Sequence, residues 1–234
     1  MGVALRTFIS SPGNQLQADL CRGLDTLVSF AAWRKNKWLD SGGFMSSFGC
    51  LLLDSGAFSV HQGAAVDLGE YREWVAHYPF AIAHAGLDDI SGNWRRSLQN
   101  YEAFPTSFPT FHDTDPPELL LDLCAMARER GGWLGVGLQP PRSGREQFLK
   151  RTIARIKSAG FDDLHVHGWA LGRYAWIDGI DSTDSTHAWL EQGKIRNALG
   201  PWLTAAEALK LAVLQVQREA KTRVQEVDGQ ASMF

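Results

Sequence analysis

Short apolar runs alternate along this chain with longer segments of helical periodicity, and this alternation constrains the fold more than any other feature of the sequence. The short runs are rich in β-branched and aromatic residues, and a strand followed by a helix is typical of successive β/α units. We count about eight such units. The candidate strands span residues 4–9, 26–32, 50–53, 80–84, 108–112, 133–137, 163–167 and 176–181.

Helical patterns follow most of these strands, over residues 68–78, 93–104, 116–130, 145–158 and 204–226. Eight strands with helices between them in 234 residues match the size of a compact (β/α)8 barrel of the TIM type. An open doubly wound sheet is the alternative. We expect one barrel domain over residues 1–226 and a flexible tail over 227–234.

Composition limits the class of protein and its partners. With 44% hydrophobic and 21% charged residues the chain has a globular composition, which excludes a disordered protein. The formal net charge is −3, so any contact with nucleic acid must come from a local basic patch. No apolar stretch approaches the roughly 20 residues of a membrane span, and no signal peptide precedes the first strand. We expect a soluble, cytoplasmic protein with no membrane partner.

The three cysteines are Cys21, Cys50 and Cys124. They are odd in number, widely spaced and set among apolar residues. This arrangement predicts reduced core thiols, and it does not fit a disulfide framework or a Cys-rich zinc site.

Polar residues gather at the predicted carboxyl ends of the strands, where barrels of this kind carry their chemistry. The segments are Asp54-Ser55-Gly56, His84 with Asp88-Asp89, His112-Asp113, Gly135–Gln139, His165–Gly168 and Asp181–Thr186. The fold therefore predicts a single mouth that receives carboxylates, imidazoles and glycines from several strands.

Each segment also has a structural interpretation. Asp before Ser-Gly is a common turn or helix cap, and a histidine at a strand end is more often structural than catalytic. His165 and His167 share one strand face and could bind a metal, but no carbamylated lysine or further ligand set accompanies them, so we expect no metal. Asp181 and Asp184 could be consecutive N-caps of a helix that begins near His187, although capping accounts for one of them at most.

Five segments carry a family resemblance: LLLDSGAFS at 51–59, FPTFHD at 108–113, LGVGL at 134–138, VHGWALG at 166–172 and DSTDSTHAW at 181–189. In this order and at strand ends, they resemble the tRNA-guanine transglycosylase superfamily. The closer similarity is to its short, phage-type relatives, some of which act on DNA. The resemblance runs from about residue 48 to 190, and the DSGAFS and DST…W segments are its most specific pieces.

The resemblance implies exchange of guanine in a polynucleotide for a 7-deazaguanine base, of the preQ0 or preQ1 kind, without a cofactor. It implies Asp184 as the nucleophile that attacks C1′, with Asp181 as a competitor because DST is duplicated, and Asp54 as the general acid/base. It implies that Asp88, with Asp89 as its neighbour, recognises the base. The remaining substrate-binding candidates are Ser55, Gly56, His112, Gly137, Leu138 and His167 within these segments and Gln139 directly after LGVGL.

The chemistry of these residue types agrees with the implied reaction. One carboxylate can stabilise or bond to an oxocarbenium-like centre, as in retaining glycosidases. A second carboxylate must move a proton as one base leaves and the other arrives. A third would anchor the N1 and N2 donors of guanine. The target base must also be flipped out or single-stranded.

The chain departs from the family in one region. The zinc-binding cysteine cluster and its following histidine are missing, so we expect a barrel that lacks the zinc subdomain. The tRNA-recognising regions around that cluster are then in doubt as well. The acceptor is either DNA or tRNA, and the short chain and phage-like motifs favour DNA. A phage origin would place the protein in the cytoplasm of the host.

Two basic stretches are candidates for nucleic-acid contact. The first follows the sixth strand and is either a phosphate-binding face or a solvated helix face; its candidates are Arg142, Arg145, Lys150 and Arg151. The second opens the Gly/Ser-rich segment 34–49, which we expect to be a long rim loop, and contains Arg34, Lys35 and Lys37 with Trp33 and Trp38 interleaved.

Two other functions stay open. One is a metal-dependent barrel hydrolase, which would use His84, His112, His165 and His167 with Asp54. The other is a catalytically silent relative that binds nucleic acid or a protein through the same mouth. A homodimer or a partner subunit could use the apolar face of 204–226, which carries Leu209, Ala212, Val213 and Val216, but our preferred interpretation of this face is the eighth barrel helix.

Overall fold

Eight parallel strands form one curled sheet in the order β4-β3-β2-β1-β8-β7-β6-β5. The computed structural model describes residues 5–61, 63, 65–138, 144–171, 174, 176–185, 187–199, 204–215 and 217–218. The strands are β1 (Arg6–Ile9), β2 (Thr26–Ser29), β3 (Leu51–Asp54), β4 (Ala83–His84), β5 (Thr110–His112), β6 (Trp133–Gly137), β7 (His165–Gly168) and β8 (Ser182–Ser185).

The sheet closes on itself at two places that distinguish a barrel from an open sheet. The first and last strands pair in parallel, with Phe8 of β1 opposite Asp184 of β8. Beyond β4, the N–H of Phe108 donates to the carbonyl of His84 at 3.0 Å, and the N–H of Gly86 donates to the carbonyl of Phe108 at 2.9 Å. A parallel bridge between Ala85 and Phe108 thus joins the β4 edge to the β5 edge. The predicted (β/α)8 fold is confirmed, and the doubly wound alternative is wrong.

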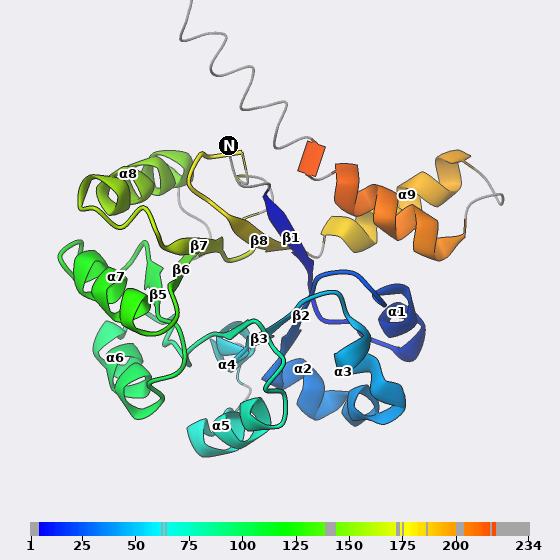
Figure 1. Cartoon of the computed structure of the whole chain (residues 1–234), viewed down its shortest axis with the longest axis horizontal. Helices are drawn as coiled ribbons and strands as arrows, with labels where there is room; N and C mark the ends of the chain where they lie inside the picture. The colour runs from blue at the N-terminus through cyan, green and yellow to red at the C-terminus, as the bar shows by residue number, and fades with distance from the viewer. Residues whose placement is uncertain are drawn as a thin grey trace, which may run out of the picture.

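Helices surround the strands (Figure 1). They are α1 (Gln15–Leu20), α2 (Phe30–Lys35), α3 (Phe44–Ser47), α4 (Ala57–His61), α5 (Leu68–Ala76), α6 (Trp94–Ala103), α7 (Leu119–Glu129), α8 (Arg145–Ser158) and α9 (His187–Leu199), with a 3-10 helix η1 (Lys37–Gly43). The predicted helices at 68–78, 93–104, 116–130 and 145–158 are confirmed as α5 to α8. Side-chain caps define two of their starts, because Asp67 accepts from the N–H of Glu70 and Asn93 from that of Arg96.

The core follows the two-residue period of the strands. Phe8, Leu27 and Leu52 point into the barrel, where they pack with Ala85 and Phe108. Their sequence neighbours point outward and pack under the helices, in one cluster beneath α1, α2, α3 and α5 and another beneath α6 to α8. Alternate residues of one strand therefore pack in two separate cores, one inside the barrel and one under the helices. The position of a polar residue along its strand thus determines whether it faces the barrel interior.

The eighth strand lies six residues later than the sequence pattern predicted. The prediction at 176–181 is wrong, because β8 is formed by Ser182–Ser185, the DSTDST run itself. The apolar residues Ile177 and Ile180 instead pack into the outer core beside α8. The helix expected near His187 is confirmed as α9. Residues Ser182–Ser185 of the DSTDST run are thus a strand, so Asp181 and Asp184 are not successive helix caps.

The segment 34–49 is helical, so the predicted rim loop is wrong. Residues 34–35 end α2, and η1 and α3 follow with one residue between α2 and η1. The segment folds because Leu39, Phe44 and Met45 are buried in the outer core. Tertiary burial here overrides the low helix propensity of Gly and Ser.

The last described helix, over residues 205–215, packs on the barrel. Ala208, Leu209 and Ala212 are fully buried, and Leu209 and Val213 contact the outer core. This supports the interpretation of the apolar face as part of the barrel. Val216, the end of the predicted helix beyond 218 and the predicted tail 227–234 lie outside the described residues.

The three cysteines are free thiols, as predicted. Cys21 and Cys124 are buried and Cys50 is partly buried. None of the helices in the described part of the chain has the length and apolar character that a membrane span requires.

Candidate active site

Three aspartates from different strands meet at the carboxyl-end mouth of the barrel. Asp54 is the last residue of β3, Asp88 follows β4, and Asp184 lies in β8. Burial raises the pKa of Asp54 to about 7, and the nearby charges of Asp88 and Asp184 contribute to that rise. Backbone N–H groups of Gly56 and Ser55 bind the same carboxyl and act in the opposite direction. Asp88 and Asp184 therefore lie near enough to Asp54 for their charges to act on its carboxyl, and all three residues stand at or just beyond the carboxyl ends of their strands.

The turn after Asp54 depends on Gly56. Its φ of +82° lies in the left-handed region, and a Cβ added to it would stand 2.8 Å from the Cβ of Ala31. Ser55, between the two, is fully buried. The positive φ and the close approach to Ala31 both favour glycine at this position. The turn that Gly56 permits directs the N–H groups of Ser55 and Gly56 toward the Asp54 carboxyl.

We expect Gly56→Ala to destabilise the fold by roughly 1–3 kcal/mol, from left-handed strain and the Ala31 clash together. Urea unfolding followed by circular dichroism measures the change. Gly63→Ala is the matched control, since Gly63 also has a positive φ, +94°, but has no atom within 4 Å of the added Cβ. Equal losses in the two variants would contradict a role for the close approach to Ala31.

The two oxygens of Asp184 have different surroundings. Oδ1 accepts a hydrogen bond of 2.6 Å from the N–H of Ala170 and lies 3.7 Å from Nε2 of His167. Oδ2 has a longer contact, 3.4 Å, with the hydroxyl of Ser10. The carboxylate is therefore oriented through Oδ1, and Oδ2 is the oxygen with more freedom to react.

Ala170 is held in a strained backbone conformation. Its φ is +51°, and among the described residues it is the one non-glycine residue with a positive φ. A left-handed conformation costs an alanine about 1 kcal/mol. The same conformation directs the N–H of Ala170 at Asp184, so the strain lies in the residue that orients the candidate nucleophile.

Asp181 lies at the opposite end of β8 from Asp184. It directly precedes the strand, and its Oδ2 accepts a 2.8 Å hydrogen bond from the N–H of Val166. Three residues separate the two aspartates, which places them about 10 Å apart along the strand. Their odd separation also directs them to opposite faces of the sheet. The structure thus brings Asp184 to Asp54 and Asp88, and it does not bring Asp181 there.

His112 joins two carboxylates at the mouth. Its Nε2 is 2.8 Å from Oδ2 of Asp88, and its Nδ1 is 3.7 Å from Oδ2 of Asp115. Burial alone would lower the pKa of His112, but Asp115 and Asp88 outweigh burial and raise it to about 10. At neutral pH the ring is therefore an imidazolium between two anions.

The four histidines of the hydrolase alternative do not converge. His84 stacks on Phe104 in the outer layer and bonds Thr106, while His112 binds Asp88. His165 and His167 both face the barrel interior, where each contacts the hydroxyl of Ser182. Among the described residues, no group of three or more His, Cys, Asp or Glu side chains is placed to hold a metal ion.

A cavity of about 300 Å³ opens beside Asp88. Its lining includes the apolar residues Ala57, Val60 and Val66 and the carboxylate residues Asp88 and Asp89. Asp89 is committed to its own loop, because its Oδ1 accepts from the N–H of Ser91. The cavity therefore combines apolar residues with the Asp88 carboxylate, as small-molecule sites commonly do.

The β6 end supplies one of its expected pocket residues. Gly137 faces the His112 ring so closely that an added Cβ would stand 2.7 Å from Cδ2 of that ring. Leu138 packs against the outer core and so does not line the mouth through its side chain. Gln139 and Arg142 lie outside the described residues.

The described residues of the first basic stretch differ in their surroundings. Arg145 begins α8, and its Nε is buried without a hydrogen-bond partner in the part of the chain that the structure describes. Lys150 pairs with Glu146 at 2.8 Å and lies over the ring of Trp176. Arg151 is exposed. Arg145 is therefore the member that most resembles a ligand-binding residue.

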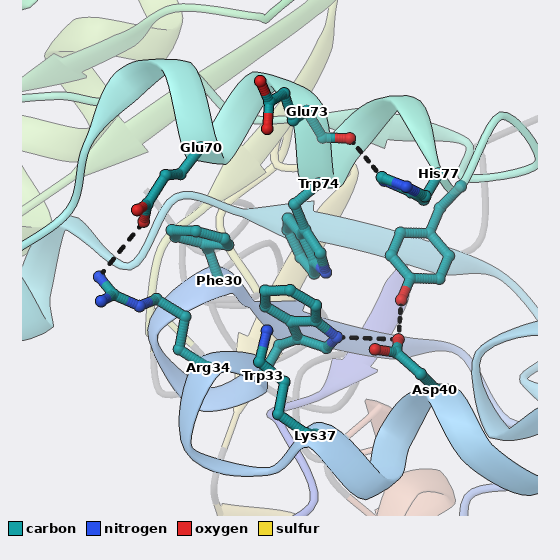
Figure 2. Close-up of a pocket in the computed structure, with 10 residues that line it drawn as sticks. Phe30, Trp33, Arg34, Lys37, Asp40, Glu70, Glu73, Trp74 and His77 are labelled. Carbon is teal, nitrogen blue, oxygen red and sulfur yellow. Dashed lines mark hydrogen bonds and ion pairs between the residues drawn. The ribbon is translucent and has the colours of Figure 1, made fainter.

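Trp33, Arg34 and Lys37 of the second basic stretch line a cavity between α2, η1 and α5 (Figure 2). Arg34 binds the carbonyl of Ala65 at 2.7 Å and reaches Glu70, and Lys37 stands 3.0 Å above the ring of Trp33. Lys35 is exposed. Arg34 and Lys37 thus have intramolecular partners, and the structure does not bring this stretch to the mouth.

Four residues that contact the site residues were not predicted from the sequence: Ser10, Asp115, Ala170 and Ser182. Asp115 had a usable signal, since it lies three residues after His112, within reach across a turn. Ser10 and Ser182 depend on strand pairing between β1, β7 and β8, which no local pattern specifies.

Comparison of the chain with models of known protein families and with curated protein sequences finds no match. The assignment of function therefore depends on the geometry of the mouth together with the resemblance of its strand-end segments.

Proposed function

We propose that the protein is a transglycosylase that exchanges guanine in a polynucleotide for a 7-deazaguanine base through a covalent aspartyl intermediate. The observation that carries the proposal is the meeting of Asp54, Asp88 and Asp184 at one mouth, with the pKa of Asp54 raised to about 7. A group with this pKa can both donate and accept a proton at neutral pH, which a reversible exchange of bases requires.

The first half of the reaction removes guanine. Oδ2 of Asp184 attacks C1′ while the bond from C1′ to N9 breaks and its electron pair leaves with the base. Asp54, in its protonated form, transfers a proton to the departing guanine. The products are neutral guanine and a glycosyl ester on Asp184, with Asp54 left as a carboxylate.

The second half inserts the new base. A 7-deazaguanine attacks C1′ through N9, the ester bond to Asp184 breaks, and the N9 proton passes to the Asp54 carboxylate. Both catalytic groups return to their starting forms, so the exchange needs no oxidant, reductant or further substrate.

Asp88 is suited to hold either base. Guanine and 7-deazaguanine share N1 and N2 donors, which require acceptors. Oδ2 of Asp88 is engaged by His112, which leaves Oδ1 for those donors. The positive His112 also offsets the accumulation of negative charge from the aspartates. The apolar residues of the adjacent cavity can receive the face of a base.

The acceptor is a polynucleotide in this proposal, with DNA favoured and tRNA as the alternative. A flipped or unpaired nucleotide must enter the mouth, so phosphates must lie nearby. The buried, unpartnered Nε of Arg145 at the start of α8 supports a phosphate contact following β6.

Incorporation of labelled guanine tests the proposal. The purified protein is incubated with single-stranded DNA, duplex DNA and bulk tRNA in parallel, and radioactivity in the polymer is measured. We expect incorporation into one class of polymer, most strongly where the target base is unpaired. Absence of incorporation into all three, with a 7-deazaguanine base also tested, would refute the proposal.

A further inference from the structure

A line of polar side chains runs through the barrel interior to the Asp184 carboxylate. Nε2 of His165 is 2.7 Å from the hydroxyl oxygen of Ser182, and Nδ1 of His167 is 2.9 Å from the same oxygen. The other nitrogen of His167, Nε2, faces Oδ1 of Asp184 at 3.7 Å. Ser182 and His167 are both fully buried. The Ser182 hydroxyl therefore connects the two imidazoles, and the ring of His167 faces Asp184, the candidate nucleophile.

Packing fixes which nitrogen faces which partner. The ring of His167 makes edge contacts with Trp169, at 4.5 Å between centroids, and with Phe8, at 5.9 Å. The ring of Trp133 lies 3.8 Å from that of His165. Exchange of the two nitrogens would require either ring to turn over inside a packed interior.

The single proton of the Ser182 hydroxyl allows two arrangements with neutral rings. If Ser182 donates to His165, then His167 must donate from Nδ1, and its bare Nε2 lone pair faces the Asp184 oxygen. If Ser182 donates to His167, the proton of that ring is on Nε2 and points at Asp184. The first arrangement sets a buried lone pair against a carboxylate, and the second sets an N–H dipole against it.

His165 is neutral, as both arrangements require, and the carboxylate of Asp184 favours the second. Burial is the largest cause that lowers the pKa of His165, to about 4, so its ring is neutral at neutral pH. A neutral His165 can carry its proton on Nε2 and donate it to the Ser182 oxygen. The order of donors then runs from His165 through Ser182 to His167.

We propose that His167 is a positioning residue that presents Nε2–H to Oδ1 of Asp184, and that the Ser182 hydroxyl fixes His167 in this tautomer. The N–H of Ala170 binds Oδ1 directly, whereas Nε2 of His167, which is buried without a hydrogen-bond partner among the described residues, acts on the same oxygen electrostatically across 3.7 Å, and Oδ2 is left for attack at C1′. Its value to catalysis rests on the proposed transglycosylase function, but the tautomer itself is a property of the free protein. In this proposal His167 acts through Asp184, whereas the sequence predicts that it binds the substrate directly.

Long-range proton–nitrogen NMR of the ¹⁵N-labelled protein at pH 7.5 tests the tautomer without any substrate. Comparison with His167→Gln identifies the signals of His167. We expect a neutral ring protonated on Nε2. A ring protonated on Nδ1, or on both nitrogens, would overturn the proposal.

Ser182→Ala tests whether the hydroxyl sets the tautomer. We expect the Nε2–H form of His167 to lose its dominance in this variant. Ser107→Ala is the matched control, since Ser107 is also fully buried but bonds the carbonyl of Phe104. An unchanged His167 tautomer in Ser182→Ala would overturn the role of Ser182. If Ser182→Ala does not fold, the spectrum of the unmodified protein still decides the tautomer.

Kinetics then separate this proposal from the proposed function. In Ser182→Ala we expect kcat for guanine exchange to fall roughly tenfold to a hundredfold, as when an orienting partner is lost, with KM for the polynucleotide unchanged. A rise in KM at constant kcat would contradict positioning. If the unmodified protein exchanges no base while His167 still shows Nε2–H, the proposed function fails and the tautomer assignment stands.

Discussion

Asp184→Asn is expected to abolish base exchange, with a loss of at least roughly 10³-fold in kcat. An amide oxygen is a poor nucleophile toward C1′, so the covalent glycosyl ester cannot form. The amide still accepts the hydrogen bond that the Ala170 N–H makes at 2.6 Å, so the fold should be retained. The loss is measured as incorporation of labelled guanine, and the unmodified protein should also yield a trapped adduct of the expected mass in denaturing mass spectrometry.

Asp181→Asn is the matched control for this prediction. It makes the same chemical change in the same DST sequence context, but at the amino end of β8. An asparagine there still accepts from the N–H of Val166, so we expect near-normal exchange. The opposite result, with activity lost in Asp181→Asn and retained in Asp184→Asn, would exclude Asp184 as the nucleophile.

Asp54→Asn is expected to reduce the release of guanine by roughly 10²–10⁴-fold, the usual contribution of a general acid. The pH dependence gives this prediction its sign. With a pKa of about 7, Asp54 is protonated below neutrality and can donate to the leaving base. Single-turnover release should therefore be constant below pH 7 and should fall about tenfold per pH unit above it. In Asp54→Asn the fall in the rate of guanine release above pH 7 should be absent.

The attribution to Asp54 has its own control. Asp67→Asn changes an exposed aspartate that caps α5, and an asparagine still accepts from the N–H of Glu70. This variant should keep both the rate and the pH profile. If the fall above pH 7 persisted in Asp54→Asn, another group would have to be the acid.

Much of the fold was predictable because its signals are local. Strands β3, β5 and β6 and helices α5 to α8 lie where apolar periodicity and turn residues predicted them. The segment 34–49 was not predictable in this way. Its Gly and Ser residues indicate a loop, and only the burial of Leu39, Phe44 and Met45 under the helices makes it helical.

The position of the last strand, β8, was also not predictable from the local sequence pattern. Ile177 and Ile180 have the apolar character of a strand, whereas Ser182–Ser185 has none. β8 forms because its backbone pairs with β1 and β7 on both sides. Inside a closed barrel, polar side chains are acceptable where they bond one another, as Ser182 does with His165 and His167.

The sequence by itself determined the β/α alternation and the set of aspartates that follow the strands, because both are written in short-range pattern and spacing. The tertiary structure alone placed Asp184, and not Asp181, at the mouth, since their placement depends on where β8 begins and on which face each residue occupies. It also decided the pKa of Asp54, which arises from burial and from charges carried by distant segments. Burial and cross-strand contacts are properties of the closed barrel, and no local stretch of sequence contains them.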